Sequence, residues 1–292
     1  MTRLGQIRGF TGDHAGAIRD LREALDLCCR LGERRGQANA LTMLGQIRGM
    51  SGDLAPAARD LRAALELSRQ FGDRRAQANA LARLGQVQRR TGDYAGALRD
   101  LRAALGHYRD LGDRTGQAHA LACIGDVRAL VGDHPDAIRD LREALDLFQG
   151  LGERHGQANT LTMLGQVRGL TGDHPGAIRD LRLSLDLFRR TGAHGNEVWA
   201  LNNYATVLAA TGDRPQALTI HHDALHLARQ THQPEHEATA LEGIGECHLC
   251  TGDTETGRTH LKQALEIFRR LAMAPDADRV QTRLAQLALR SG

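Results

Sequence analysis

Hydrophobic and small residues recur along the chain with the spacing of an amphipathic helix, and short polar breaks interrupt the pattern at regular intervals. The segment 34–50 places Leu41, Leu44 and Ile47 on one helical face, and the segment 54–70 repeats the pattern after a Ser-Gly-Asp break. Glycine at such a break can adopt the left-handed conformation that ends a helix, and the aspartate after it can accept hydrogen bonds from the first free amides of the next helix. The pattern therefore predicts two antiparallel helices joined by a tight turn.

This helix pair recurs with a period of 40 residues along the whole chain. Residues 11–40 and 131–160 are nearly the same sequence, and the expected cap glycines stand one period apart at Gly12, Gly52, Gly92, Gly132, Gly172, Gly212 and Gly252. A fixed period in this range is typical of a solenoid. We therefore expect about seven helix hairpins in residues 1–275, the first helix being truncated at Met1, and a C-terminal capping helix in residues 276–292.

The hairpins resemble the tetratricopeptide repeat family over the whole chain. The residues that carry the resemblance are Leu44 and Gly45 in the first helix of a hairpin and Ala57, Leu61 and Ala64 in the second. It implies an all-α fold, a right-handed α-solenoid of tandem antiparallel helix hairpins. The period departs from the usual value of about 34 residues. HEAT-type hairpins, with periods of about 40 to 47 residues, are an alternative that does not account for the Gly/Ala/Ala spacing.

Long repeats of this kind are similar to the bacterial arrays of SARP-type transcriptional regulators and STAND-class signalling ATPases, and also to kinesin light chains and Rap-type peptide sensors. The sequence contains no GxxxxGK[ST] phosphate loop and no recognisable winged-helix segment. The first hairpin begins at Met1 with only the second half of its first helix. We therefore expect a fragment of a longer protein, or an array whose first half-helix lies upstream.

Composition narrows the classes of partner. The 292 residues include 38 basic and 35 acidic residues, a net charge of +3, so no basic nucleic-acid-binding surface is indicated. No apolar run of about 18 residues is long enough to span a membrane, and no secretory signal precedes the repeats. The five cysteines are too few and too irregularly spaced for a disulfide framework. These features predict a cytoplasmic protein without a cofactor, a membrane or a nucleic acid as partner.

The resemblance implies where a partner binds, because the first helices of such repeats line the concave wall of the superhelix. Two ladders of amide side chains follow this wall at Asn39, Asn79 and Asn159 and at Gln6, Gln46, Gln86 and Gln166. A primary amide both donates and accepts hydrogen bonds, so such a row can pair with the backbone of an extended peptide. Repeats copied by duplication also carry identical surface amides without a selected role, and the pattern alone leaves both explanations open.

Differences between the repeats predict a direction for the bound peptide. Arg83, Arg89 and Arg90 form a basic spot on the expected wall, and Glu242 and Glu246 form an acidic one three to four repeats away. We therefore expect a ligand with an acidic group near the first spot and a basic group near the second.

The other candidates on this wall are Asp126, Trp199, Asn202 and Asn203. Trp199 is the only tryptophan of the chain and lies in the most divergent repeat. It is either an aromatic anchor for the partner or a space filler beside the altered segment 191–197. Farther along, Arg279 and Arg283 lie on the expected open side of the last helix, where they suit a solvating cap.

Metal-binding chemistry is a weaker possibility. His222 and His226 have the i, i+4 spacing of a zinc pair on a helix. The repeat register places them on the exposed face of a second helix, outside the groove, so we treat them only as weak candidates. The Arg-Asp pairs of the second helices are expected to be exposed charges that support pairs along one helix.

The sequence therefore predicts a non-enzymatic scaffold that binds a protein or an extended peptide in its concave groove. The alternative is a ligand-sensing regulatory arm of a larger signalling ATPase or transcription regulator, with an effector domain of the same protein as a further partner. A third hypothesis is a metalloenzyme centred on the two histidines.

Overall fold

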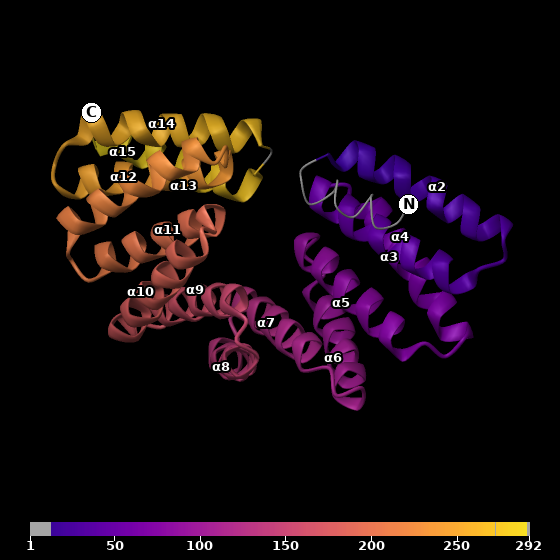
Figure 1. Ribbon diagram of the computed structural model, residues 1–292. Helices are drawn as coiled ribbons and strands as arrows, with labels where there is room; N and C mark the ends of the chain where they lie inside the picture. The colour runs from indigo at the N-terminus through magenta and orange to yellow at the C-terminus, as the bar shows by residue number, and fades with distance from the viewer. Residues whose placement is uncertain (1–12, 272, 291–292) are drawn as a thin grey trace. The chain divides into compact units, whose positions relative to one another are not determined.

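The computed structural model describes residues 13–271 and 273–290. Residues 1–12, which include Gln6, Gly12 and the expected truncated helix, lie outside the described part. The chain divides into two compact units, unit 1 (Met1–Leu151) and unit 2 (Gly152–Gly292). Apart from short turns and caps, the described residues form α-helices (Figure 1).

Each unit consists of consecutive antiparallel helices. Unit 1 contains α2 (His14–Arg30), α3 (Arg34–Ser51), α4 (Leu54–Gln70), α5 (Arg74–Arg90), α6 (Tyr94–Asp110), α7 (Arg114–Leu130) and α8 (His134–Leu151). Unit 2 contains α9 (Arg154–Leu170), α10 (His174–Thr191), α11 (His194–Ala210), α12 (Arg214–Gln230), α13 (Pro234–Cys250), α14 (Thr254–Arg270) and α15 (Ala274–Arg290). The odd-numbered helices from α3 onward are the first helices of the repeats, and the even-numbered ones are the second helices.

The helix caps have the predicted chemistry. Gly52 ends α3 with a φ of 93°, a left-handed conformation that costs glycine little because it has no Cβ. The Asp13 carboxylate accepts a hydrogen bond of 2.8 Å from the Gly16 amide at the start of α2. Asp53 makes no such bond because the residue at the equivalent position is Pro56, which has no N–H.

Small residues let the two helices of a hairpin approach closely. A Cβ added at Gly45 on α3 would lie 2.5 Å from Cγ of Leu61 on α4, which is closer than non-bonded carbon atoms can pack. Leu61 is fully buried and belongs to a cluster with Ala57, Leu84 and Val87. Alanine and glycine at these contacts therefore replace the large aromatic side chains of an ordinary globular core.

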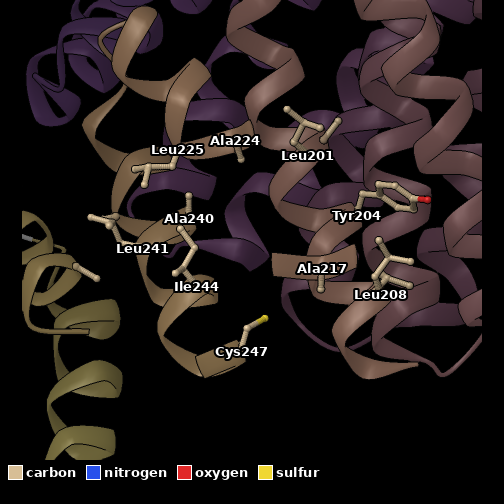
Figure 2. Packing of buried hydrophobic residues seen from close by; sticks show 14 of the residues in the cluster. Leu201, Tyr204, Leu208, Ala217, Ala224, Leu225, Ala240, Leu241, Ile244 and Cys247 are labelled. Atoms are coloured by element: carbon tan, nitrogen blue, oxygen red, sulfur yellow. The ribbon is translucent and has the colours of Figure 1, made fainter. Parts of the chain in front are cut away.

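The core of unit 2 runs through successive hairpins. Figure 2 shows Leu201 and Tyr204 of α11, Leu225 of α12, and Leu241 and Ile244 of α13 among its buried side chains. Among the described residues of the chain, Phe148, Phe188 and Phe268 are the largest fully buried side chains. None of the helices in the described part of the chain is long and apolar enough to cross a membrane.

Pairs of charged residues link the helices within a hairpin, which corrects the expectation that the second-helix aspartates are exposed. Arg168 of α9 pairs with Asp180 of α10, and both are buried. The pKa of Asp180 is raised, because burial raises it more than the adjacent Arg168 lowers it. Arg48 and Asp60, and likewise Arg128 and Asp140, form the equivalent pairs in unit 1. The first-helix arginine of these hairpins therefore acts as an internal partner for the second-helix carboxylate.

Candidate functional site

The first helices of unit 1 line a cavity of 690 Å³. The predicted residues among its walls are Asn39, Gln46, Asn79, Arg83 and Gln86. Thus α3 and α5 bring the amide ladders and the cation of the basic spot to one cavity. Because first helices in consecutive repeats present the same register to this side, residues about 40 positions apart in sequence become neighbours.

The C-terminal end of α6 also contributes to this cavity, which sequence reasoning missed. Tyr108 lines the cavity, and its hydroxyl donates a hydrogen bond of 2.9 Å to Oδ1 of Asn79. Burial raises the pKa of Tyr108 to about 12, so the phenol keeps its proton at neutral pH. The position equivalent to Tyr108 is Ser68 one repeat earlier and Phe148 one repeat later, and this departure from a strict repeat is the signal that could have identified it.

Arg83 is the unpaired cation of the unit 1 cavity. Its side chain is half-buried, and the guanidinium makes no ion pair or hydrogen bond with the described residues. Burial lowers the pKa of Arg83, although the usual value of 12.5 is so high that the side chain stays charged at neutral pH. A half-buried, uncompensated guanidinium is an anchor for a carboxylate or another anion.

The other two arginines of the expected basic spot are already engaged. Arg89 pairs with Asp126 at 3.2 Å, and this pair joins α5 to α7. Arg90 donates a hydrogen bond to the backbone carbonyl of Gly49 on α3. The basic spot therefore narrows to one free cation, because the neighbouring first helices supply acceptors for the other two.

The expected acidic spot needs a correction, because it is compensated. Glu242 accepts two hydrogen bonds from Arg279 at 2.9 and 2.8 Å, and Glu246 accepts two from Arg283 at 2.8 and 2.9 Å. These two arginines, expected on the open side of the last helix, are at least partly exposed and also bind α15 to the wall of α13. Bidentate ion pairs of this kind leave little net charge for a basic ligand.

A spacing of 37 residues explains these pairs. Adjacent first helices meet where residue i of one faces residue i+37 of the next, as in Arg89–Asp126 and Glu242–Arg279. The amide ladder follows the same rule in unit 2, where Nδ2 of Asn196 donates to Oδ1 of Asn159 at 2.9 Å. The spacing can be counted in the sequence, but only the packing of the helices shows that residues 37 positions apart contact each other.

The remaining predicted residues of unit 2 differ in accessibility. Asn202 is 3% exposed and donates a hydrogen bond of 3.1 Å to the His236 backbone carbonyl, so it joins α11 to α13 and is no open groove residue. Nδ2 of Asn203 donates to the Trp199 carbonyl at 2.9 Å, and both residues are half-buried. Gln166 is exposed on α9.

The histidines named as weak metal candidates are exposed on α12. His226 contacts the Gln230 amide at 2.9 Å through Nε2, and His222 lies near His248 and His260, whose charges lower its pKa together with the larger effect of burial. Within the described residues no group of three or more histidine, cysteine or acidic side chains is arranged to hold a metal ion.

Comparison with models of known protein families identifies the family of this chain. The tetratricopeptide repeat model matches residues 1–70, 116–190 and 196–270, which together are most of the chain. The chain belongs to the tetratricopeptide repeat family. No curated protein sequence matches it significantly.

Solved structures of tetratricopeptide repeat proteins have the same fold. The sensor-bearing STAND protein PH0952 from Pyrococcus horikoshii aligns with a TM-score of 0.72 at 17% identity, over 97% of this chain and 43% of that one. A Rap protein in complex with competence and sporulation factor gives 0.68 at 14% identity, over 94% and 80%. BtubC from P. vanneervenii gives 0.63 at 18% identity, over 76% and 92%. At these identities the similarity establishes the fold alone.

Tetratricopeptide repeat proteins are typically scaffolds that bind proteins or peptides, and the family is generally non-enzymatic. In this member, the cavity on the first helices of unit 1 combines exposed amides with an uncompensated cation. On the corresponding side of unit 2, Glu242 and Glu246 are paired with Arg279 and Arg283.

Proposed function

We propose that this tetratricopeptide repeat protein is a non-enzymatic scaffold that holds an extended peptide, or an extended segment of a protein, along the first helices of its repeats. The observation that carries the proposal is the unit 1 cavity of 690 Å³ with the unpaired guanidinium of Arg83 in its wall. A half-buried cation without a partner is costly in the free protein, and an acidic ligand group removes that cost.

The amides beside Arg83 suit the backbone of such a ligand. Asn39 and Asn79 are exposed, and Gln46 and Gln86 are half-buried in the same walls. Each amide offers two donor hydrogens and an acceptor oxygen, which match the alternating donors and acceptors of an extended peptide. The proposed ligand is therefore an extended peptide with a carboxylate, from an acidic side chain or a chain terminus, placed at Arg83.

A regulatory role is the second candidate. The sensor-bearing STAND protein contains a region similar to 97% of this chain, and that region is 43% of its own length. The Rap protein was solved in complex with competence and sporulation factor. In this case, peptide binding by the repeats would control an effector in the same full-length protein, in the reducing cytoplasm that suits five unpaired cysteines.

The test is selection of peptides from a random display library on the intact chain, followed by affinity measurement with the Arg83→Gln variant. We expect the selected peptides to share an acidic group and to bind the variant at least about tenfold more weakly, since hydrogen bonds to charged groups contribute about 1.5–3 kcal/mol. Arg62→Gln is the matched control, because Arg62 is exposed on the second helix α4 and its loss changes the net charge equally.

Two results would contradict the proposal. Selected peptides without a common acidic group would exclude Arg83 as the anchor. Equal losses in Arg83→Gln and Arg62→Gln would show that overall charge, and not this cavity, governs binding. Expression of the full-length gene, with the activity of any effector domain measured with and without a selected peptide, distinguishes a scaffold from a sensing arm. Only a sensing arm changes the effector activity when the peptide binds.

A further inference from the structure

The hairpin formed by α11 and α12 departs from the others at two contacting positions. In the other hairpins whose two helices are both described, a glycine of the first helix packs against a leucine of the second, as Gly45 does against Leu61. In α11 this glycine is replaced by Ala205, and in α12 the leucine is replaced by His221. The Cβ of an alanine occupies space that the leucine side chain uses elsewhere, so a different side chain arrangement is required.

The ring of His221 is accommodated by the next first helix. A Cβ added at Gly243 on α13 would lie 2.2 Å from both Cε1 and Nε2 of His221, so only glycine leaves room for the ring. Gly243 stands at a groove position that carries a side chain in the other repeats, among them Met43, Arg83 and Asn203. The three departures, at 205, 221 and 243, are therefore interdependent parts of one local structure.

This exchange opens a cavity of 390 Å³ within unit 2. His221, Gly243 and Cys247 line it, together with residues of α11 and α15. Figure 2 shows Cys247 at the end of α13, below Ile244. The volume lies within the range of about 300–1,000 Å³ that is typical of ligand pockets.

The polar groups at this cavity favour an uncharged ligand. His221 is 2% exposed, its Nδ1 is buried without a partner, and neither ring nitrogen hydrogen-bonds to a described residue. Burial lowers the pKa of His221 from 6.5 to about 4, with a smaller effect of His222, so at neutral pH the ring is uncharged, with one donor and one acceptor.

The charged groups that border the cavity are mostly compensated. Glu242 and Glu246 form bidentate pairs with Arg279 and Arg283. The side chain of Arg214, exposed to solvent at the start of α12, makes no ion pair or hydrogen bond with a described residue. Buried polar atoms without a hydrogen-bond partner are rare in protein interiors. Nε2 of His221 lies toward Gly243, which lines the cavity, so a neutral ligand group can hydrogen-bond to this nitrogen without the desolvation penalty of an ion.

We propose that this cavity receives a tyrosine side chain of the peptide bound by the repeats, with the phenolic hydroxyl hydrogen-bonded to His221. The proposal rests on the proposed peptide-binding function. A hydroxyl both donates and accepts, so it serves either neutral tautomer of the imidazole. The aromatic ring supplies an apolar body for the cavity and carries its single polar group at the tip.

The decisive measurement compares N-acetyl-tyrosinamide with N-acetyl-phenylalaninamide on the intact chain. The imidazole C–H resonances of His221, assigned from their absence in the Ala205→Gly/His221→Leu variant, are followed by NMR at neutral pH during each titration. We expect the tyrosine compound to shift these resonances saturably and to bind about fivefold more tightly than the phenylalanine compound. Equal affinities, or no shift with either compound, would overturn the proposal and leave water as the partner of His221.

Variants that restore the residues of the other hairpins provide the second arm. We expect Ala205→Gly/His221→Leu to remain folded, because this Gly–Leu pair packs in the other hairpins, and to lose the preference for the tyrosine compound. The further change Gly243→Met fills the cavity and removes binding of both compounds. If either set of variants retains the tyrosine preference, the proposal is wrong. If the variants do not fold, the comparison of the two compounds on the wild-type chain still decides.

The result is separable from the test of the proposed function. The two probes carry no acidic group, and Arg83 belongs to unit 1, so failure of Arg83-dependent peptide binding leaves the NMR result unchanged. Conversely, peptides that depend on Arg83 but bind equally well after replacement of every tyrosine by phenylalanine would refute the tyrosine pocket and retain the scaffold.

Discussion

The two units are built from the same repeat but differ in how their first helices treat charge. In unit 1, Arg83 remains uncompensated in a cavity lined by amides. In unit 2, Glu242 and Glu246 are bound by arginines of α15, and the smaller cavity has a neutral imidazole in its wall. Repeats that share a core can therefore present different chemistry, through a changed groove position in unit 1 and a changed contact between helices in unit 2.

The difference also shows how one substitution requires others. Arg83 alters only the groove, since the Gly–Leu contacts of its neighbours are retained. His221 replaces a core leucine and is accompanied by Ala205 and Gly243. A change at the groove surface is local, whereas a change at the contact between helices spreads to the next hairpin.

The largest expected effect is a pH dependence of the stability of unit 2 that arises from His221. Above pH 6.5 His221 is neutral in both the folded and the unfolded chain, and between pH 6.5 and about 4 only the unfolded chain binds the proton. The free energy of unfolding therefore decreases as the pH falls, by on the order of 3 kcal/mol at pH 4. Fluorescence of Trp199 in α11 reports urea unfolding of unit 2 and measures this change.

The control for the pH effect is the Ala205→Gly/His221→Leu variant. It retains the other titrating groups of unit 2, including His236, whose pKa is also lowered by burial. The difference between wild type and variant therefore isolates His221. The same loss of stability with falling pH in both proteins would refute the assignment.

A second, smaller effect is expected when the two glutamates of α13 lose their arginine partners on α15. Replacement Arg279→Ala/Arg283→Ala leaves Glu242 and Glu246 without partners and should destabilise the docking of α15 by about 1 kcal/mol per pair, the upper end for partly exposed ion pairs. Hydrogen exchange of residues 274–290 measures the change. Lys262→Ala/Arg270→Ala removes two exposed cations from α14 and should leave this exchange unaltered.

Removal of one hydroxyl tests the amide wall of unit 1. Tyr108→Phe deletes the hydrogen bond to Asn79 and should cost about 1 kcal/mol, the usual net contribution of a neutral hydrogen bond. Faster hydrogen exchange of the α5 and α6 amides would be the observable. Tyr204→Phe, which deletes the bond from Arg182 in unit 2, should leave the exchange of unit 1 unchanged.

The smallest expected effect enlarges the basic spot. Asp126→Asn removes the partner of Arg89 and should tighten the binding of an acidic peptide selected on the wild type by about threefold, because a partly exposed charge contributes up to ~1 kcal/mol. Titration calorimetry compares this variant with Asp110→Asn, which changes the charge equally on α6, away from the lining of the cavity. Equal gains in both variants would attribute the effect to net charge.

Much of the fold could be predicted from the sequence because its signals are local. Cap glycines such as Gly52, the aspartates after them and the Gly45–Leu61 contact act within one hairpin, and a period of 40 residues repeats them. The last helix begins at Ala274, two residues before the predicted boundary at residue 276. Pro275 lies inside its first turn, where the missing N–H costs no hydrogen bond, and the Ala277 amide donates to the Met273 carbonyl.

The candidate site was less accessible, because it depends on contacts between repeats. The sequence located Arg83 on the groove wall but did not reveal that Asp126 and the Gly49 carbonyl engage the two neighbouring arginines. It placed Asn202 on the open wall, whereas packing against α13 buries it. The charged residues of one helix do not show which charges are unpaired, because their partners lie about 37 residues away on the next first helix.

The sequence by itself determined the helix hairpin, its period and its family, since helix caps, apolar spacing and small contact residues are local properties of the chain. Only the tertiary structure decided which charges remain free and where cavities open. Those outcomes depend on the stacking of neighbouring first helices, which brings residue i beside residue i+37 and gives similar repeats surfaces of different chemistry.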